Sequence, residues 1–264
     1  MSIDSQTLLN QYIPFNKAVP YNNFYIHAIR LCDMHQVDYA LSVLQIDKNI
    51  LGQIELISMS NLRFVLMIAE TDNDFAVSFE FLLRKALNIP DDHIIQKYIG
   101  NKQEFLIIGK EIDNIHNKII FTEDTMIKIT SEDFDEIKNI ILFQTFPDYT
   151  DKYIDPDVKK ATDEYYRLKN KGAKTVPLEH KVICVQAKTG MTLEQIGNLT
   201  IRNFYQLFDV IVDEGDYKIN KSAELNGVKF KEPIEHWAYK ERKDKYAEAF
   251  CDADSFSTYI QSAN

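Results

Sequence analysis

The chain has 264 residues, of which 45% are hydrophobic and 27% charged, and its formal net charge is −10. This composition is close to that of an average globular protein and excludes wholesale disorder, collagen and coiled-coil rods. Length alone predicts one large domain or two modest ones. Glycine (8) and proline (7) are scarce, which argues against long flexible linkers.

Charge is divided unevenly along the chain. Residues 1–150 hold 12 basic and 21 acidic side chains, whereas residues 151–264 hold 18 and 19. Proteins that bind duplexes usually present a basic face, because much of their affinity comes from neutralising phosphates. Residues 1–150 are therefore poorly suited to binding nucleic acid, and any basic patch is expected in residues 151–264.

Cysteine usage and the N-terminal residues predict a cytosolic protein with no membrane association. The three cysteines, Cys32, Cys184 and Cys251, are odd in number and show no CxxC spacing, which favours a reducing compartment. The start of the chain lacks the basic and apolar regions of a secretory signal. The longest apolar-rich window, 61–69, is far shorter than the ~20 residues of a membrane helix.

The first 90 residues predict one strand followed by three helices. Apolar residues alternate along the strand and recur at helical spacing in the helices, with Ser58 or Ser60 as a cap and Pro90 as a stop. Asp72 or Asp74 is expected to cap the last helix. In chain order, the predicted elements are a strand over 24–31 and helices over 34–48, 62–69 and 75–87.

Residues 93–130 predict a small antiparallel meander. Short β-branched runs alternate there with Gly, Asn and Asp turns, which is typical of hairpins. The pair Thr130-Ser131 then predicts the start of a helix whose apolar face is formed by Phe134, Ile137, Ile140 and Ile141. The acidic, aromatic stretch 147–156 is the predicted domain boundary.

From Asp157 onward the pattern is helical. Residues 158–168 show one apolar and one charged face, and Lys171-Gly172 is the expected stop. Pro177 is predicted at the first position of a helix that ends at Gly190. Thr192 with Gln195 predicts a capping box, and Thr200 is expected to open a longer helix.

The motifs of common enzymes are absent from the sequence, and no catalytic residue or cofactor is predicted. GxxxxGK[ST], GxGxxG, HExxH and GxSxG do not occur. His180 and Cys184 have the i, i+4 spacing of two metal ligands, although a cysteine among valines and isoleucine is more often a core residue. The acidic runs 70–74 and 209–216 suit a hard cation, but also a helix cap or a solvated helix end.

Residues 191–213 resemble a helix-turn-helix outline. Arg202, Asn203 and Gln206 would lie on its second helix, where side chains reach base edges. The same pattern also forms any small corner between two helices, and Phe204 and Leu207 are needed for packing. A DNA-binding regulator is therefore one alternative function, and an enzyme with an acidic metal site is another.

Aromatic residues near the C-terminus form the candidate partner-binding site. His236, Trp237 and Tyr239 lie in the sequence PIEHWAYK, and Trp237 is the only tryptophan. Tryptophan is enriched at binding hot spots, but it is also a common core anchor. The spaced apolar residues of 247–264 could dock on the same chain or on a neighbour.

Four stretches together resemble a known group of proteins: IPFNKAVPY, IHAIRLCDMHQVDYALSVLQIDKN, LEHKVICVQAKTGMTLEQIGNLTIRNFYQLF and YKINKSAELNGVKFKEPIEHW. The group comprises tail or baseplate assembly proteins and chaperones of tailed bacteriophages. The first half is also similar in outline to the baseplate hub assembly proteins of T4-like phages. These stretches carry no hallmark residue that could be transferred, so no site follows from the resemblance.

The resemblance implies a non-enzymatic assembly role, with phage tail or baseplate proteins as partners and self-association as a further option. Nucleic acid is not an expected partner. The protein would act in the host cytoplasm or remain in the virion tail. The predicted fold is α+β, with an α+β domain over 1–150 that contains the antiparallel sheet and a mainly helical domain over 151–264.

Overall fold

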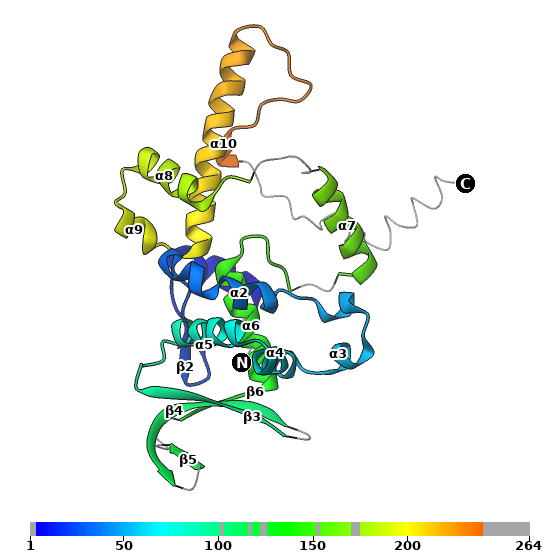
Figure 1. Cartoon of the computed structure of the whole chain (residues 1–264). Helices are drawn as coiled ribbons and strands as arrows, with labels where there is room; N and C mark the ends of the chain where they lie inside the picture. The colour runs from blue at the N-terminus through cyan, green and yellow to red at the C-terminus, as the bar shows by residue number, and fades with distance from the viewer. Residues whose placement is uncertain are drawn as a thin grey trace, which may run out of the picture. The chain divides into compact units, whose positions relative to one another are not determined.

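The computed structural model describes residues 4–100, 103–115, 118–121, 126–151, 154–169 and 175–239. These residues form a mixed fold, with a small antiparallel sheet in the N-terminal part and helices in the C-terminal region, as the sequence predicts (Figure 1). The chain divides into two compact units. The first unit comprises residues 1–149 and 192–205, and the second comprises 150–191 and 206–264.

The first unit begins with short helical turns and a two-stranded hairpin. Its elements up to the main sheet are α1 (Ser5–Thr7), η1 (Leu8–Tyr12), η2 (Ile13–Phe15), β1 (Val19–Tyr21), β2 (Phe24–Ile26), η3 (Leu31–Asp33), α2 (Met34–Leu44), η4 (Lys48–Leu51), α3 (Ile54–Ser58), α4 (Asn61–Thr71) and α5 (Asn73–Ala86).

Two of the predicted caps are present at the starts of α4 and α5. The Ser60 hydroxyl accepts a hydrogen bond from the Arg63 N–H, and the Asp72 carboxylate accepts one from the Phe75 N–H. Each cap satisfies an N–H group that the helix itself leaves without a partner.

The predicted strand over 24–31 is shorter than expected, because the backbone of its second half forms hydrogen bonds with distant segments and not with the neighbouring strand. The strand β2 ends at Ile26. The next N–H, that of His27, donates to the carbonyl of Ala86 at 2.7 Å instead of continuing a ladder. Arg30 then forms an isolated antiparallel bridge with Thr200.

The main sheet contains β3 (His93–Ile99), β4 (Glu104–Ile115), β5 (Lys118–Phe121) and β6 (Ile127–Thr130). All pairings are antiparallel, as predicted, but the strand order is not that of a simple meander. The long strand β4 pairs with β3 and β6 through its first half and with β5 through its second half. The last strand therefore lies beside β4 and not beside β5.

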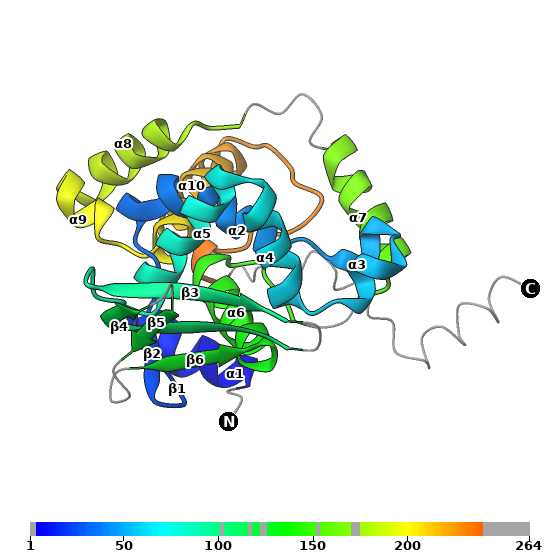
Figure 2. The ribbon, with the colours of Figure 1, turned by 60° about the horizontal axis from the view of Figure 1, so that its bottom comes forward.

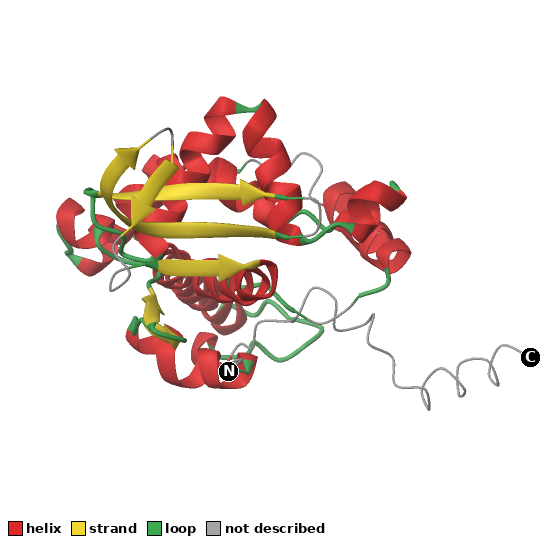
Figure 3. Ribbon diagram, turned by 90° about the horizontal axis from the view of Figure 1, so that it is seen from below, coloured by secondary structure: helices red, strands yellow, loops and turns green. Residues whose placement is uncertain are grey.

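Helices cover one face of this sheet. Leu106, Ile108 and Ile129 are buried on that face, and Figure 3 shows the strands in front of the helix layer that contains α4, α5 and α6 (Ser131–Thr145). Figure 2 shows the same arrangement from another side. The predicted apolar face of α6 is confirmed, since Phe134, Ile137, Ile140 and Ile141 are all buried.

The second unit is helical in its described residues. Its elements are α7 (Pro156–Lys169), α8 (Leu178–Thr189), most of α10 (Ile201–Leu225) and η6 (Trp237–Tyr239), while α9 (Leu193–Gly197) belongs to the first unit. Pro177 is the residue before α8 and not its first residue, and Gly190 ends that helix with φ of 73°. The capping box of Thr192 and Gln195 is present. The predicted stop at Lys171-Gly172 lies outside the described residues.

No helix in the described part of the chain is long and apolar enough to cross a membrane.

Candidate functional site

The three predicted partner-binding residues lie in an aromatic cluster of the second unit. His236 contacts Tyr217 of α10 with ring centroids 4.8 Å apart, and it also lies against Trp237 at 5.4 Å and Tyr239 at 5.9 Å. The contact with Tyr217 returns the chain to the middle of α10 after the turn at Asn226 and Gly227 (Figure 1). We name these four side chains the aromatic cluster.

The aromatic cluster is largely open to solvent. Tyr239 is 75% exposed, His236 is exposed and Trp237 is only half-buried. The alternative in which Trp237 anchors a core is therefore not what the described residues show. An exposed cluster of rings that packs around a histidine is the type of surface that contributes strongly to protein interfaces.

Large apolar side chains are exposed over all the long helices of the second unit. Among the described residues of this unit, Val185 is the only apolar side chain that is buried. The exposed ones are Val158, Tyr165, Leu168, Val176, Leu178, Ile183, Val210, Val212, Ile219, Leu225, Val228, Phe230 and Tyr239. Large exposed apolar patches mark interaction sites, whereas single exposed apolar residues are ordinary on a protein surface.

The helix α7 shows this exposure along one predicted face. Val158, Tyr165 and Leu168 follow one another at i, i+7 and i+10 and are 39%, 58% and 55% exposed. The sequence pattern identifies them correctly as an apolar face. Among the described residues, these three side chains therefore lie at the surface of α7 and not in a core.

The structure gives no support to the helix-turn-helix alternative at Arg202, one of its three candidate base-contacting residues. The segment does contain α9, a short turn and α10. Arg202, however, is only 5% exposed, and its Nη1 donates to the carbonyls of Phe143 at 2.6 Å and Phe146 at 2.7 Å. A guanidinium engaged in this way is part of the fold and cannot reach a base edge.

Clusters able to hold a metal ion are not found among the described residues. Asp72 of the first acidic run caps α5, and Glu214 of the second pairs with Lys218 at 2.6 Å. The pKa of Glu214 lies below its ordinary value because of the Lys218 hydrogen bond and charge. His180 is exposed and Cys184 is half-buried, so Cys184 is not the core residue that its neighbours suggested.

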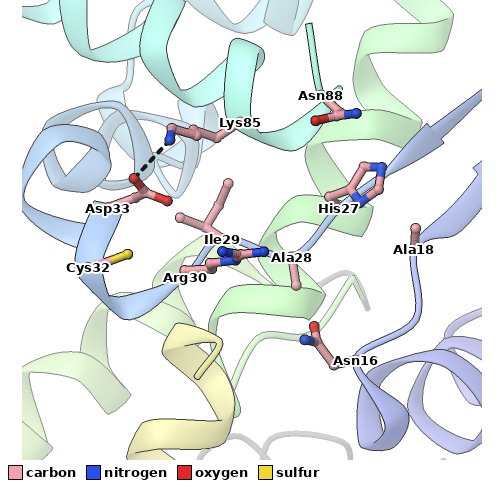
Figure 4. A pocket seen from close by; sticks show the side chains of 10 residues that line it. All are labelled: Asn16, Ala18, His27, Ala28, Ile29, Arg30, Cys32, Asp33, Lys85 and Asn88. Carbon is pink, nitrogen blue, oxygen red and sulfur yellow. Dashed lines mark ion pairs between the residues drawn. The ribbon is translucent and has the colours of Figure 1, made fainter. Parts of the chain in front are cut away.

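A cavity of about 450 Å³ lies in the first unit at the point where the predicted strand is interrupted. Figure 4 shows Asp33 and Lys85 paired on one side, His27 and Asn88 on the other, and the Arg30 side chain between them. Asn16 also lines the cavity. Sequence reasoning missed this cavity, because its lining comes from three separate segments with no common motif.

Residues 165–241 match the family model of the YomV second domain. The matched stretch begins near the end of α7 and ends just after η6, so it includes α8, α9, α10 and the aromatic cluster but only the last turn of α7. No curated protein and no solved structure is significantly similar to the chain. YomV is a phage-region protein, and the match therefore suggests a phage-related protein.

Proposed function

We propose that the protein is a phage tail or baseplate assembly protein that binds other tail components and catalyses no reaction. The observation that carries this proposal is the exposure of apolar side chains throughout the described helices of the second unit. The segment that matches a domain of a phage-region protein contains most of these exposed side chains. The coincidence supports a binding role for that part of the chain.

Physical chemistry favours association for such a surface. Each large apolar side chain that moves from water into an interface contributes about 1.5–3 kcal/mol at most, before the costs of association. Several together can drive a specific contact, and the net charge of −10 helps to keep the free protein soluble. The acidic first part also favours approach of a basic partner surface.

The test is co-purification with defined partners. The full chain would be co-expressed in turn with each tail and baseplate protein encoded by the same phage genome, and retention on the tagged chain would be measured. We expect at least one of these proteins to be retained. A chain that remains monomeric and retains none of them would contradict the proposal.

Matched variants locate the contact. The double change Tyr165→Ser and Leu168→Ser on α7, and separately Ile219→Ser on α10, are expected to weaken retention by tenfold or more. Val77→Ser is the control, because Val77 is 63% exposed but lies on α5 of the first unit. Equal loss in the control and in the α7 and α10 variants would show that the second unit is not the binding surface.

A further inference from the structure

The cavity of the first unit presents hydrogen-bond donors that the protein leaves unused. One guanidinium nitrogen of Arg30, Nη1, donates to Asn198 Oδ1 at 3.1 Å. Among the described residues, Nε and Nη2 of Arg30 have no acceptor, and neither do the amide nitrogens of Asn16 and Asn88. The ring nitrogens of His27 are likewise without a protein partner in the described part of the chain.

The backbone carbonyls at the end of α5 beside this cavity already accept hydrogen bonds. The end of α5 lies at the wall, and its last four carbonyls all accept backbone hydrogen bonds. Those of residues 83, 84 and 85 accept from residues 87, 89 and 88, and that of Ala86 accepts from His27. The carbonyl groups at the negative end of this helix are therefore paired with nearby N–H groups, and they do not face the cavity as unpaired acceptors.

The charge balance also favours an anion. The only carboxylate among the lining residues is Asp33, which pairs with Lys85 Nζ at 3.1 Å and whose side chain is only 16% exposed. This pair is neutral, so Arg30 remains as the one uncompensated full charge of the lining. An uncompensated cation is unusual in this part of the chain, because residues 1–150 carry 21 acidic side chains and only 12 basic ones.

We propose that this cavity binds the oxyanion group of a small ligand, a carboxylate or a phosphate, through the free edge of the Arg30 guanidinium. A guanidinium presents paired N–H groups that match the two oxygens of either group. His27 and the two asparagine amides supply further polar contacts around it. The volume of about 450 Å³ is within the range of pockets for small organic ligands and exceeds what one phosphate ion needs. This site does not depend on the proposed function.

Calorimetry on the full chain tests the proposal. Inorganic phosphate and succinate are titrated separately at constant ionic strength, with chloride as the balancing anion. We expect a saturable heat with at least one of them, and the tighter of the two identifies the preferred group. Absence of saturable binding for both anions would overturn the proposal.

Four variants make the test specific. Arg30→Gln is expected to weaken binding by about tenfold or more, since it removes a charged hydrogen-bond donor. Asp33→Asn is expected to tighten binding severalfold, because it releases Lys85 towards the cavity. Asn198→Ala removes the protein acceptor of Arg30 but keeps the charge, and binding should be retained.

Arg167→Gln is the charge-matched control, since Arg167 has a side chain that is 75% exposed on α7 of the second unit. It changes the net charge by the same amount as Arg30→Gln. Equal binding by Arg30→Gln and the unmodified protein, or an equal loss in Arg167→Gln, would also overturn the proposal.

Discussion

The two units of this protein use apolar side chains in opposite ways. In the first unit, rings and aliphatic chains from α2, α4, α5, α6 and the sheet form one continuous core, in which Phe75, Phe79 and Phe134 pack against one another. In the second unit, the described helices bury Val185 and expose most of their other large apolar residues. A hydrophobic core stabilises the first unit, whereas the described helices of the second unit leave much of their apolar area exposed.

Polar contacts show the same difference. In the first unit, side chains far apart in sequence are joined, such as Asn61 with Asp135 at 2.7 Å. In the second unit, the pairs Lys218–Glu214 and Lys221–Glu224 join residues within one helical turn. Such local, exposed pairs stabilise a helix more than a tertiary arrangement.

The largest expected loss of stability comes from a substitution that creates a cavity in the core of the first unit. Phe134 is 1% exposed, and its ring centroid lies 6.0 Å from that of Phe79. Phe134→Ala should lower the free energy of unfolding by about 3–5 kcal/mol, through lost burial and the cavity that remains. Phe230→Ala is the matched change in the second unit, where Phe230 is 41% exposed, and its effect should stay within about 0.5 kcal/mol.

Urea denaturation followed by circular dichroism measures both changes. Similar losses of stability in the two variants would show that the second unit also depends on a buried core, and the contrast between the units would fail.

The next largest effect is expected at Arg202, which anchors the start of α10 to the rest of the first unit. Its guanidinium donates to the carbonyls of Phe143 and Phe146, and more weakly to that of Pro147 at 3.4 Å. Arg202→Ala leaves these buried acceptors without their donor and should cost about 2–4 kcal/mol. Arg202→Lys should recover only part of the lost stability, because a single ammonium group cannot donate to several carbonyls in the plane of the guanidinium as arginine does.

Arg167→Ala on the exposed face of α7 is the comparison for Arg202, and it should change the free energy of unfolding by less than about 0.5 kcal/mol. The same denaturation experiment applies. If Arg202→Ala is as stable as Arg167→Ala, this side chain does not hold the segment 192–205 to the rest of the first unit.

Much of the fold was readable from the sequence because its signals are local. The caps at Ser60, Thr130 and Thr192 and the apolar face of α6 depend only on residues within a few turns, and all are confirmed. The predicted strand over 24–31 is too long because distant partners replace strand pairing after Ile26, beginning with the His27 N–H, which donates to the carbonyl of Ala86. The backbone of Leu31 donates to the carbonyl of Leu199, so that part of the chain leaves the hairpin.

The sites were less readable for the same reason. Arg202 follows a turn in the sequence and therefore suggested a base contact, yet the carbonyls that bury it come from the end of α6 and the loop after it. The cavity is formed by Asn16, the segment 27–33 and the end of α5, which no spacing rule connects. The exposure of the apolar face of α7 could not be predicted from the sequence either, because an amphipathic pattern does not say what covers its apolar side.

A smaller effect is expected at Glu104, a carboxylate that joins the sheet to two helices. Its Oε1 accepts hydrogen bonds from the hydroxyl of Ser60, which caps α4, and from that of Ser131 at the start of α6. A negative charge beside two helix N-termini is favourable. Glu104→Ala should therefore cost about 1–2 kcal/mol.

The matched acid in the second unit is Glu164, whose exposed side chain pairs with Arg167 at 3.3 Å. Glu164→Ala should cost less than about 0.5 kcal/mol, since exposed pairs contribute little. Equal costs for the two acids, measured by urea denaturation, would mean that the long-range contacts of the first unit add no more than the local ones of the second.

The smallest expected effect is a pH dependence at Asp133, which closes the capping box of α6. Partial burial alone would raise the pKa of this carboxyl, but hydrogen bonds from Thr130, Tyr21 and Asn22 outweigh burial and lower the pKa below its ordinary value. A lowered folded-state pKa means that the carboxylate stabilises the fold above its unfolded-state pKa of about 3.9, and that this stability is lost as the pH falls through the folded-state pKa. Asp133→Asn should therefore be less stable than the unmodified protein at pH 7 and should lose less stability between about pH 5 and pH 2. Thermal unfolding across this range measures the difference.

Asp216→Asn on exposed α10 is the control. If stability falls equally between about pH 5 and pH 2 in all three proteins, the contact between α6 and the β1–β2 hairpin does not depend on the Asp133 charge. Other long-range polar contacts of the first unit, such as that of Asn61 with Asp135, would then have to provide the stabilisation.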